Sequence, residues 1–351
     1  MTDKSAIRAR ADAALAAFKA AGASVIEADI LQPGATLLDL YGEDIRARAY
    51  VVHDPVRGEM MLRPDFTIPM MRAHATSDLD TARYTYSGEV FRVPEDGTDR
   101  PAEYIQVGFE RVGPTDAATA DAEVFARLIE ALSPMELAPV TGDMGLLRAA
   151  VLGLRTSDAR KAALLRHLWR PGRFRRLLDR FSEPVTVSTR APGTAADIGK
   201  RRRPEIEARV AALHAESAEA PLSATEVALI DDLMDLRETA SNALSQLQNF
   251  AVDVEGLTSA VNAFEARLDA LAKSGVDVDT LPFEASYGRT TLEYYDGFVF
   301  GIYAQGRPDL PPIALGGRYD GLAATLTDGA TRQAVGGVIR PGILVEAEGG
   351  Q

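Results

Sequence analysis

The chain has 351 residues, 46% of them hydrophobic and 25% charged, a balance typical of a globular protein with a substantial core. The absence of cysteine excludes disulfides, thiolate metal sites and a cysteine nucleophile. The net charge of -13 argues against a general nucleic-acid binder, because neutralising phosphates needs clustered Lys and Arg. There is no apolar run of about twenty residues and no signal-peptide pattern, so we expect a cytoplasmic protein.

The first part of the chain predicts one long helix followed by short strands. Residues 5–22 have the spacing of an amphipathic helix, and Gly22 is placed to end it. Residues 49–63 have the pattern of a β-hairpin. Thr67 is a candidate cap for a short helix over residues 68–74.

Two β-rich runs come next, over residues 83–93 and 103–112. Side chains alternate between the faces of a strand, so Gln106, Gly108 and Glu110 share one face. The glycine between an amide and a carboxylate leaves room for a small ligand with a cationic amine. Taken alone, the same residues also fit a solvated sheet face.

The middle of the chain, residues 141–280, predicts a mainly helical insertion with a short β-like interruption at 183–189. Its basic segment could face RNA, a phosphorylated ligand or an acidic partner, although a solvated helical face is the commoner explanation. The segment contains Arg160, Lys161, Arg166, Arg170, Arg173, Arg175, Arg176 and Arg180, and then Lys200, Arg201, Arg202 and Arg203.

The histidines give no sign of a metal site. They are scattered and form no HxxxH or HExxH pattern, so we expect surface or partly buried groups and no bound metal. They are His53, His74, His167 and His214.

Six motifs occur in one order: LRPDFT, GEVFR and QVGFE between residues 62 and 113, then GRTTLEYYDGFVF, ALGGRYDGL and AVGGVIRPG. This series resembles the catalytic core of class II aminoacyl-tRNA synthetases, specifically the histidyl enzyme. Its closest match is a shortened relative in that family, the regulatory subunit of ATP phosphoribosyltransferase. The resemblance implies an α+β fold with a mostly antiparallel, six- or seven-stranded sheet flanked by helices. Residues 1–140 and 281–351 would form this core, interrupted by the helical insertion and without a C-terminal anticodon-binding domain.

The resemblance also implies a histidine pocket. Two carboxylates of that family hold the ligand's amine, and the matching residues here are Asp65 and Glu110. Buried charges need such paired partners. The other matches are Thr67 and Gln106 beside the carboxylates, Arg100 for the ligand's carboxylate, and Tyr295 and Tyr319 at the imidazole end.

The groups that the family uses to activate an amino acid with ATP match less well. Arg92 and Arg340 stand at two of its arginines and are candidates for residual phosphate or nucleotide contacts. Pro94 and Ile339 replace two of its glutamates, which would leave the site short of metal ligands.

A further arginine of that family is replaced by Thr290. Arg289 lies one position too early, and a one-residue offset along a strand points to the opposite face. We therefore expect no catalytic residue and no cofactor.

These expectations describe a non-catalytic regulatory subunit. It would be required by the short-form catalytic subunit of ATP phosphoribosyltransferase in the first step of histidine biosynthesis, and would bind histidine for feedback inhibition. The resemblance implies a homodimer as the building block and a hetero-oligomer with that partner, with no tRNA and no membrane. Two alternatives stay open: a histidyl-tRNA synthetase-like enzyme with a separate anticodon domain, and an enzyme that activates an amino acid for another acceptor.

Overall fold

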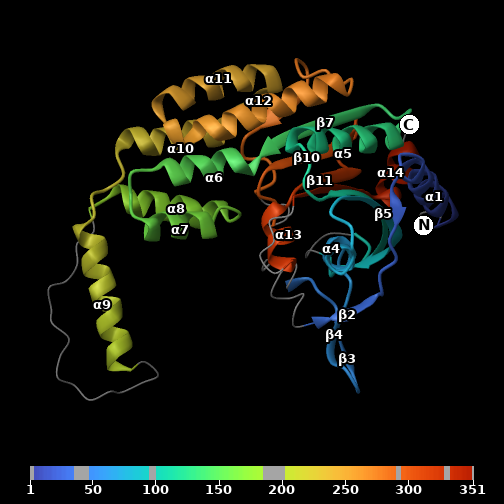
Figure 1. Cartoon of the computed structure of the whole chain (residues 1–351), viewed down its shortest axis with the longest axis horizontal. Coiled ribbons are helices and arrows are strands. Elements are labelled where there is room, and N and C mark those ends of the chain that lie inside the picture. Colours follow the sequence, from blue (N-terminus) through green and yellow to red (C-terminus); the bar gives the residue numbers. More distant parts are fainter. Residues whose placement is uncertain are drawn as a thin grey trace.

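The computed structural model describes residues 4–34, 47–94, 100–184, 202–289, 294–327 and 333–349. A large sheet with helices packed on it forms the body, and further helices extend from it to one side (Figure 1). The predicted α+β class is confirmed. Among the described residues, no helix has the length and apolar character needed to cross a membrane.

The main sheet has nine strands in the described part of the chain, in the order β1-β5-β6-β12-β11-β10-β7-β9-β8. The pairs β1–β5 and β7–β9 are parallel, and the others are antiparallel. The prediction of six or seven strands was wrong because β1, β8 and β9 are too short to leave a local pattern. The strands are β1 (Ser24–Val25), β5 (Ala82–Phe91), β6 (Glu103–Val112), β7 (Leu137–Asp143), β8 (Arg237–Thr239), β9 (Pro282–Glu284), β10 (Phe298–Ala304), β11 (Ala314–Arg318) and β12 (Ala334–Ile339).

One face of this sheet is covered by α1 (Lys4–Ala20), α5 (Ala117–Leu132) and α14 (Pro341–Glu348). Phe18 of α1 lies 5.3 Å from Phe109 of β6 between ring centroids, so the apolar face of that strand is used by the core. Such buried aromatic contacts supply much of the stabilising apolar burial. The opposite face of β6, with Gln106 and Glu110, is left for the candidate site.

That second face is bordered by a short helix and a small sheet. The predicted helix is α4 (Thr67–Ala75), but Thr67 is its first residue and not its cap. Asp65 Oδ1 accepts a hydrogen bond from the Thr67 N–H at 3.0 Å, so this carboxylate supplies the local side-chain hydrogen bond. The small sheet contains the predicted hairpin and has the order β2 (Leu31–Pro33), β4 (Gly58–Leu62), β3 (Val51–Asp54).

Residues 144–273 supply the helices that extend from the body. Asp143, at the end of β7, caps the first of them, and β8 returns from this region to join the main sheet. Most of the β-like interruption expected at 183–189 lies outside the described residues. The helices are α6 (Met144–Gly153), α7 (Asp158–Arg166), α8 (Pro171–Ser182), α9 (Arg203–Ala218), α10 (Ala224–Asp235), α11 (Ala240–Asp253) and α12 (Thr258–Lys273).

A buried ion-pair network joins α12 to the body. Arg267 donates to Asp121 at 2.8 Å and to Asp143 at 2.7 Å. Arg318 donates to the same Asp121 at 3.0 and 2.7 Å. Removing one member would leave a buried charge without its partner, which is strongly destabilising. The network therefore fixes the insertion against α5 and the sheet.

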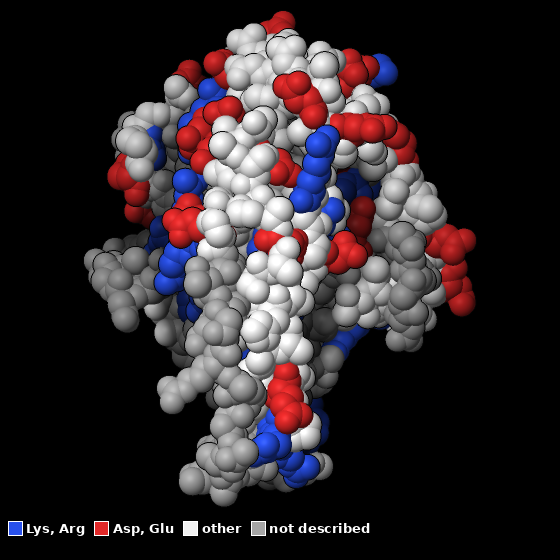
Figure 2. Space-filling model, turned by 90° about the vertical axis from the view of Figure 1, so that its left-hand side faces the viewer, with Lys and Arg blue, Asp and Glu red and all other residues white. Residues whose placement is uncertain are grey.

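Part of the basic segment serves the fold. Arg160 is buried, donates to the carbonyl of Ala220 at 2.9 Å and lies 3.3 Å from Glu219. Arg175 pairs with Asp179 and Asp231. On the face that Figure 2 shows, basic side chains stand among acidic ones and form no continuous basic surface.

His74 differs from the expectation for histidines. It is fully buried, and its Nδ1 lies 2.9 Å from the hydroxyl of Tyr84. The prediction of a surface or partly buried group is therefore wrong for this residue, because a tyrosine partner satisfies the ring within the core.

Candidate functional site

Glu110 on β6 is the centre of the candidate site. Its side chain is 2% exposed, and both carboxylate oxygens accept hydrogen bonds from phenols. Tyr86 donates to Oε1 at 2.7 Å, and Tyr319 donates to Oε2 at 2.6 Å. The register places Gly336 of β12 opposite Glu110, and a Cβ at position 336 would overlap Oε2. A glycine is therefore needed here for the carboxylate to lie against the neighbouring strand.

Tyr86 is a member of this site that the sequence analysis missed. It lies opposite Gly108 in the β5–β6 register, and its ring fills the space above that glycine. The room predicted there for a ligand is therefore occupied by a side chain. The ring also stacks on Phe66, with 4.4 Å between centroids and 10° between planes. No local pattern could reveal Tyr86, because the pairing register depends on the loop between the two strands.

Asp65 brings a second buried carboxylate to the site from the turn before α4. Its Oδ2 lies 3.6 Å from Nη2 of Arg92, and its side chain is almost fully buried. Thr67 and Gln106 are buried as well, and in the described part of the chain Oε1 of Gln106 has no hydrogen-bond partner. This amide oxygen is an acceptor available to a ligand's N–H.

The two predicted tyrosines lie close to these carboxylates. Burial raises the pKa of Tyr295, and the negative charges of Glu110 and Asp65 raise it further. Burial also raises the pKa of Tyr319 well above its usual value. Tyr294 lies between them, with its ring centroid 5.0 Å from Tyr295 and 5.9 Å from Tyr319. Both predicted phenols therefore stay neutral and act as hydrogen-bond donors or acceptors.

The electrostatics favour a cationic occupant. Burial raises the pKa of Glu110 from 4.5 to about 7; the phenols of Tyr319 and Tyr86 oppose this rise, and Asp65 adds to it. The partners that the structure gives Glu110 are neutral, and a buried carboxylate is costly without a positive partner. An ammonium or imidazolium group bound here would remove that cost.

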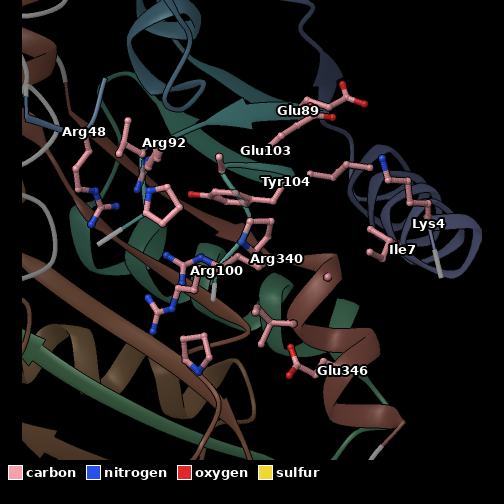
Figure 3. Close-up of a pocket in the computed structure, with 18 of the residues that line it drawn as sticks. Lys4, Ile7, Arg48, Glu89, Arg92, Arg100, Glu103, Tyr104, Arg340 and Glu346 are labelled. Atoms are coloured by element: carbon pink, nitrogen blue, oxygen red, sulfur yellow. The ribbon is translucent and has the colours of Figure 1, made fainter. Parts of the chain in front are cut away.

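A cavity of about 650 Å³ lies beside this pocket and has the opposite charge character. Arg48, Arg92, Arg100 and Arg340 line one end of it, while α1 and α14 border the other (Figure 3). Arg92 borders both spaces, because it also approaches Asp65 and donates to the carbonyl of Pro64 at 2.8 Å.

The positive charge of Arg340 is unfavourable in this arginine cluster. Burial lowers its pKa, and the positive charges of Arg92 and Arg100 lower it further. Its Nε is buried and has no hydrogen-bond partner among the residues that the structure describes. An anion in the cavity would supply that partner.

The structure therefore divides the predicted residues between two spaces. Asp65 and Glu110 lie near Tyr295 and Tyr319. Gln106 is buried on the same strand as Glu110, whereas Arg100 is exposed and lines the arginine cavity. Arg92 stands on the border. Arg48 also lines this cavity and was not predicted, because nothing around it in the sequence marks it.

Arg289 points away from both spaces, as its one-residue offset predicted. Its Nε donates to the carbonyl of Leu168 at 2.9 Å, and its guanidinium lies 5.0 Å from the ring centroid of Phe174 in the insertion. Thr290 lies outside the described residues. Pro94 lines the arginine cavity, and Ile339 is buried at the end of β12, so neither position offers a carboxylate.

Comparison with known proteins places this chain in a family. The family model described as histidyl-tRNA synthetase matches residues 2–175 and 203–341. An ATP phosphoribosyltransferase regulatory subunit from Agrobacterium fabrum is 32% identical, with 88% of each chain covered. A protein of the same name from Mesorhizobium japonicum is 33% identical over 88% of this chain and 89% of its own.

Solved structures agree on the fold. A crystal structure from Bacillus halodurans, titled as an ATP phosphoribosyltransferase regulatory subunit/histidyl-tRNA synthetase, has a TM-score of 0.71 at 21% identity. It covers 99% of this chain and 81% of its own. Histidyl-tRNA synthetase from Nostoc has a TM-score of 0.66 at 17% identity, covering 98% of this chain and 72% of its own. The chain belongs to the family of ATP phosphoribosyltransferase regulatory subunits, which shares the histidyl-tRNA synthetase fold.

Proposed function

We propose that this chain binds histidine and thereby controls a short-form ATP phosphoribosyltransferase catalytic subunit, in the cytoplasm, at the first step of histidine biosynthesis. The observation that carries this proposal is Glu110, a buried carboxylate held by two neutral phenols beside a second carboxylate, Asp65. A free amino acid brings the missing positive charge in its ammonium group. Histidine adds an imidazole that tyrosine hydroxyls can recognise.

In this proposal the ligand's ammonium lies between Asp65 and Glu110. Thr67 and Gln106 border the same space, and Gln106 offers the unpaired Oε1. The imidazole faces the two tyrosines, Tyr295 and Tyr319. The ligand's carboxylate faces the side where the arginines begin, towards Arg100.

The chain is proposed to lack catalysis of its own. The arginine-lined cavity could hold the phosphates of a nucleotide, but Pro94 and Ile339 supply none of the oxygens that Mg²⁺ requires. The glutamates that line the cavity, Glu89, Glu103 and Glu346, stand at other positions, and the described residues contain no group of three such side chains that could hold a metal ion. We assign Arg92 and Arg340 to residual phosphate contacts, on the ground that Arg340 has a buried Nε with no partner.

The proposed assembly is a homodimer of this chain joined to the short-form catalytic subunit in a hetero-oligomer. Residues 1–140 and 281–351 would form the synthetase-like unit that holds histidine, and residues 141–280 the insertion. Feedback requires a coupling free energy between the histidine pocket and the partner interface, typically about 1–3 kcal/mol.

Reconstitution tests this function. The purified chain is mixed with a short-form catalytic subunit, and the condensation of ATP with phosphoribosyl pyrophosphate is measured with and without histidine. We expect the rate to depend on this chain and to fall when histidine is added. A catalytic subunit that is equally active without this chain would contradict the proposal.

The competing enzyme function has its own assay. Histidine-dependent exchange of pyrophosphate into ATP is measured with the chain alone. We expect no exchange above the rate without protein. Measurable exchange would favour an amino-acid-activating enzyme.

A further inference from the structure

Tyr295 and Tyr319 reach the pocket from two separate turns. Tyr295 precedes β10, and Tyr319 follows β11 as the residue before α13 (Asp320–Leu326). These strands are antiparallel, with Val299 opposite Gly317, so the start of one and the end of the other meet at the same edge. The two phenols keep a fixed relation only if these turns are fastened together.

Hydrogen bonds of Asp296 link the two turns. Its N–H donates to the carbonyl of Arg318 at 3.0 Å. Its Oδ1 accepts from the N–H of Asp320 at 3.1 Å, and its Oδ2 accepts from the N–H of Gly321 at 2.6 Å. These three hydrogen bonds surround Tyr319 on both sides in the chain. Asp296 itself directly follows Tyr295.

The fastening bears on the geometry around Glu110. Tyr319 donates to the carboxylate at 2.6 Å, a length at which a shift of a few tenths of an ångström weakens the bond. Tyr295 lies against Gly317, where an added Cβ would be 2.8 Å from the ring Cδ1. Both tyrosines are buried, so a displaced ring would have to move its neighbours. The position of both rings therefore depends on the turn that Asp296 holds.

The chemistry of the clamp favours a carboxylate. Two successive N–H groups at the start of α13 are each met by one oxygen, an arrangement that an aspartate fulfils and an asparagine meets on one side only. Burial and the charge of Asp320 raise the pKa of Asp296 to about 6, whereas the hydrogen bonds from the N–H groups of Gly321 and Asp320 favour its ionised form.

We propose that Asp296 is a positioning residue of the pocket, which sets Tyr295 and Tyr319 at their working distance from Glu110 without touching the ligand. For the identity of the ligand this inference rests on the proposed function. Asp296 was absent from the residues predicted from the sequence, where it is one acid after a tyrosine pair.

The test compares Asp296→Ala with Asp116→Ala. Asp116 is a matched control because it also caps a helix, accepting from the N–H of Thr119 at 2.8 Å, and it lies outside the pocket. Histidine affinity is measured by calorimetry on the full chain. We expect Asp296→Ala to weaken binding about tenfold or more, Asp296→Asn to weaken it less, and Asp116→Ala to leave it unchanged. Thermal unfolding shows whether the caps have similar effects on stability.

A second readout needs no ligand. The Glu110 carboxyl is titrated by carbon-13 NMR in the ligand-free chain, where the wild type has a pKa of about 7. Weakening the Tyr319 bond removes a donor that favours the ionised form, so the pKa should rise in Asp296→Ala and stay unchanged in Asp116→Ala. An unchanged Glu110 pKa in Asp296→Ala overturns the inference, whatever the affinity does.

The two proposals fail in different ways. A wild-type chain that ignores histidine contradicts the proposed function, and the Glu110 titration then still decides the role of Asp296. If Asp296→Ala does not fold, Asp296→Asn provides the same comparison, because it keeps one of the two acceptors.

Discussion

Two neighbouring regions of this chain favour ligands of opposite charge. The pocket around Glu110 has two buried carboxylates, and the partners of Glu110 among the described residues are the neutral phenols of Tyr86 and Tyr319. The cavity beside it is lined by five arginines, and the Nε of one of them, Arg340, has no hydrogen-bond partner among the described residues. Arg92 separates them. The acidic region is where we propose that the amino acid binds, and the basic cavity would favour an anion. Among the described residues, no group of three acidic, histidine or cysteine side chains could hold a metal ion.

The largest effect on histidine binding should come from a side chain that fills the space beside Glu110. In Gly336→Ala the new Cβ overlaps Oε2, so the carboxylate must leave its two phenols or β12 must shift. We expect loss of histidine binding in calorimetry and a lower unfolding temperature.

A matched variant is Gly172→Ala on α8, where an added Cβ meets no atom within 4 Å. It should leave binding unchanged and stabilise the helix by up to about 1 kcal/mol. Retained histidine affinity in Gly336→Ala would show that the ligand does not use Glu110 in its observed position.

Replacing one carboxylate of the pocket by the amide of the same shape should have the next largest effect on histidine affinity. In Glu110→Gln or Asp65→Asn the ligand's ammonium keeps one carboxylate partner, and truncating a buried charged pair typically costs about 2–5 kcal/mol. We expect affinity to fall at least about 30-fold in a histidine titration. Glu123→Gln is the control, since Glu123 pairs with Arg83 outside the pocket. Equal affinities in all three variants would show that histidine does not bind in the acidic pocket.

The acidic pocket should also respond to pH. The pKa of Glu110 is raised from 4.5 to about 7, so between these values the folded ligand-free chain holds a proton that the unfolded chain has released. Its contribution to stability therefore decreases as pH rises from about 4.5 to about 7. A cationic ligand requires the ionised form, so binding should release this proton below pH 7.

Calorimetry in buffers of different ionisation enthalpy measures that release. The observed heat at pH 6 should depend on the buffer in the wild type, and this dependence should shrink in Glu110→Gln. A buffer-dependence that is equal in both proteins would place the titrating group elsewhere.

The smallest effect on histidine should come from the basic space. Arg340→Gln removes a guanidinium that lines the arginine cavity. We expect histidine affinity to stay within about threefold, a change below 1 kcal/mol. Binding of pyrophosphate, measured in the same calorimeter, should become weaker. A large loss of histidine affinity would show that the arginine cavity and the acidic pocket form one binding site.

Much of this arrangement could be predicted from the sequence. The alternation along β6 indicated that Gln106 and Glu110 share a face. The offset of Arg289 indicated that it does not take the role of the family's arginine; Arg289 contacts the insertion, but it lies in a turn and not in a strand. The helices around the sheet followed from apolar spacing. These features depend on local periodicity, which the chain displays directly.

The rest depends on register and on contacts between distant segments. Tyr86 joins the site only because β5 and β6 pair with it opposite Gly108. Asp296 acts through residues 318–321, which lie on another turn. The short strand β8 exists only because β9 lies beside it. Thr67 was predicted as a helix cap, but it is the first residue of α4, and its N–H donates to Asp65 two residues earlier.

Titration of the purified wild-type chain with L-histidine tests the central claim most directly. The account predicts saturable binding at one site per chain, with proton release below pH 7 that depends on Glu110. Absence of binding at millimolar histidine, or binding that survives Glu110→Gln unchanged, would contradict it.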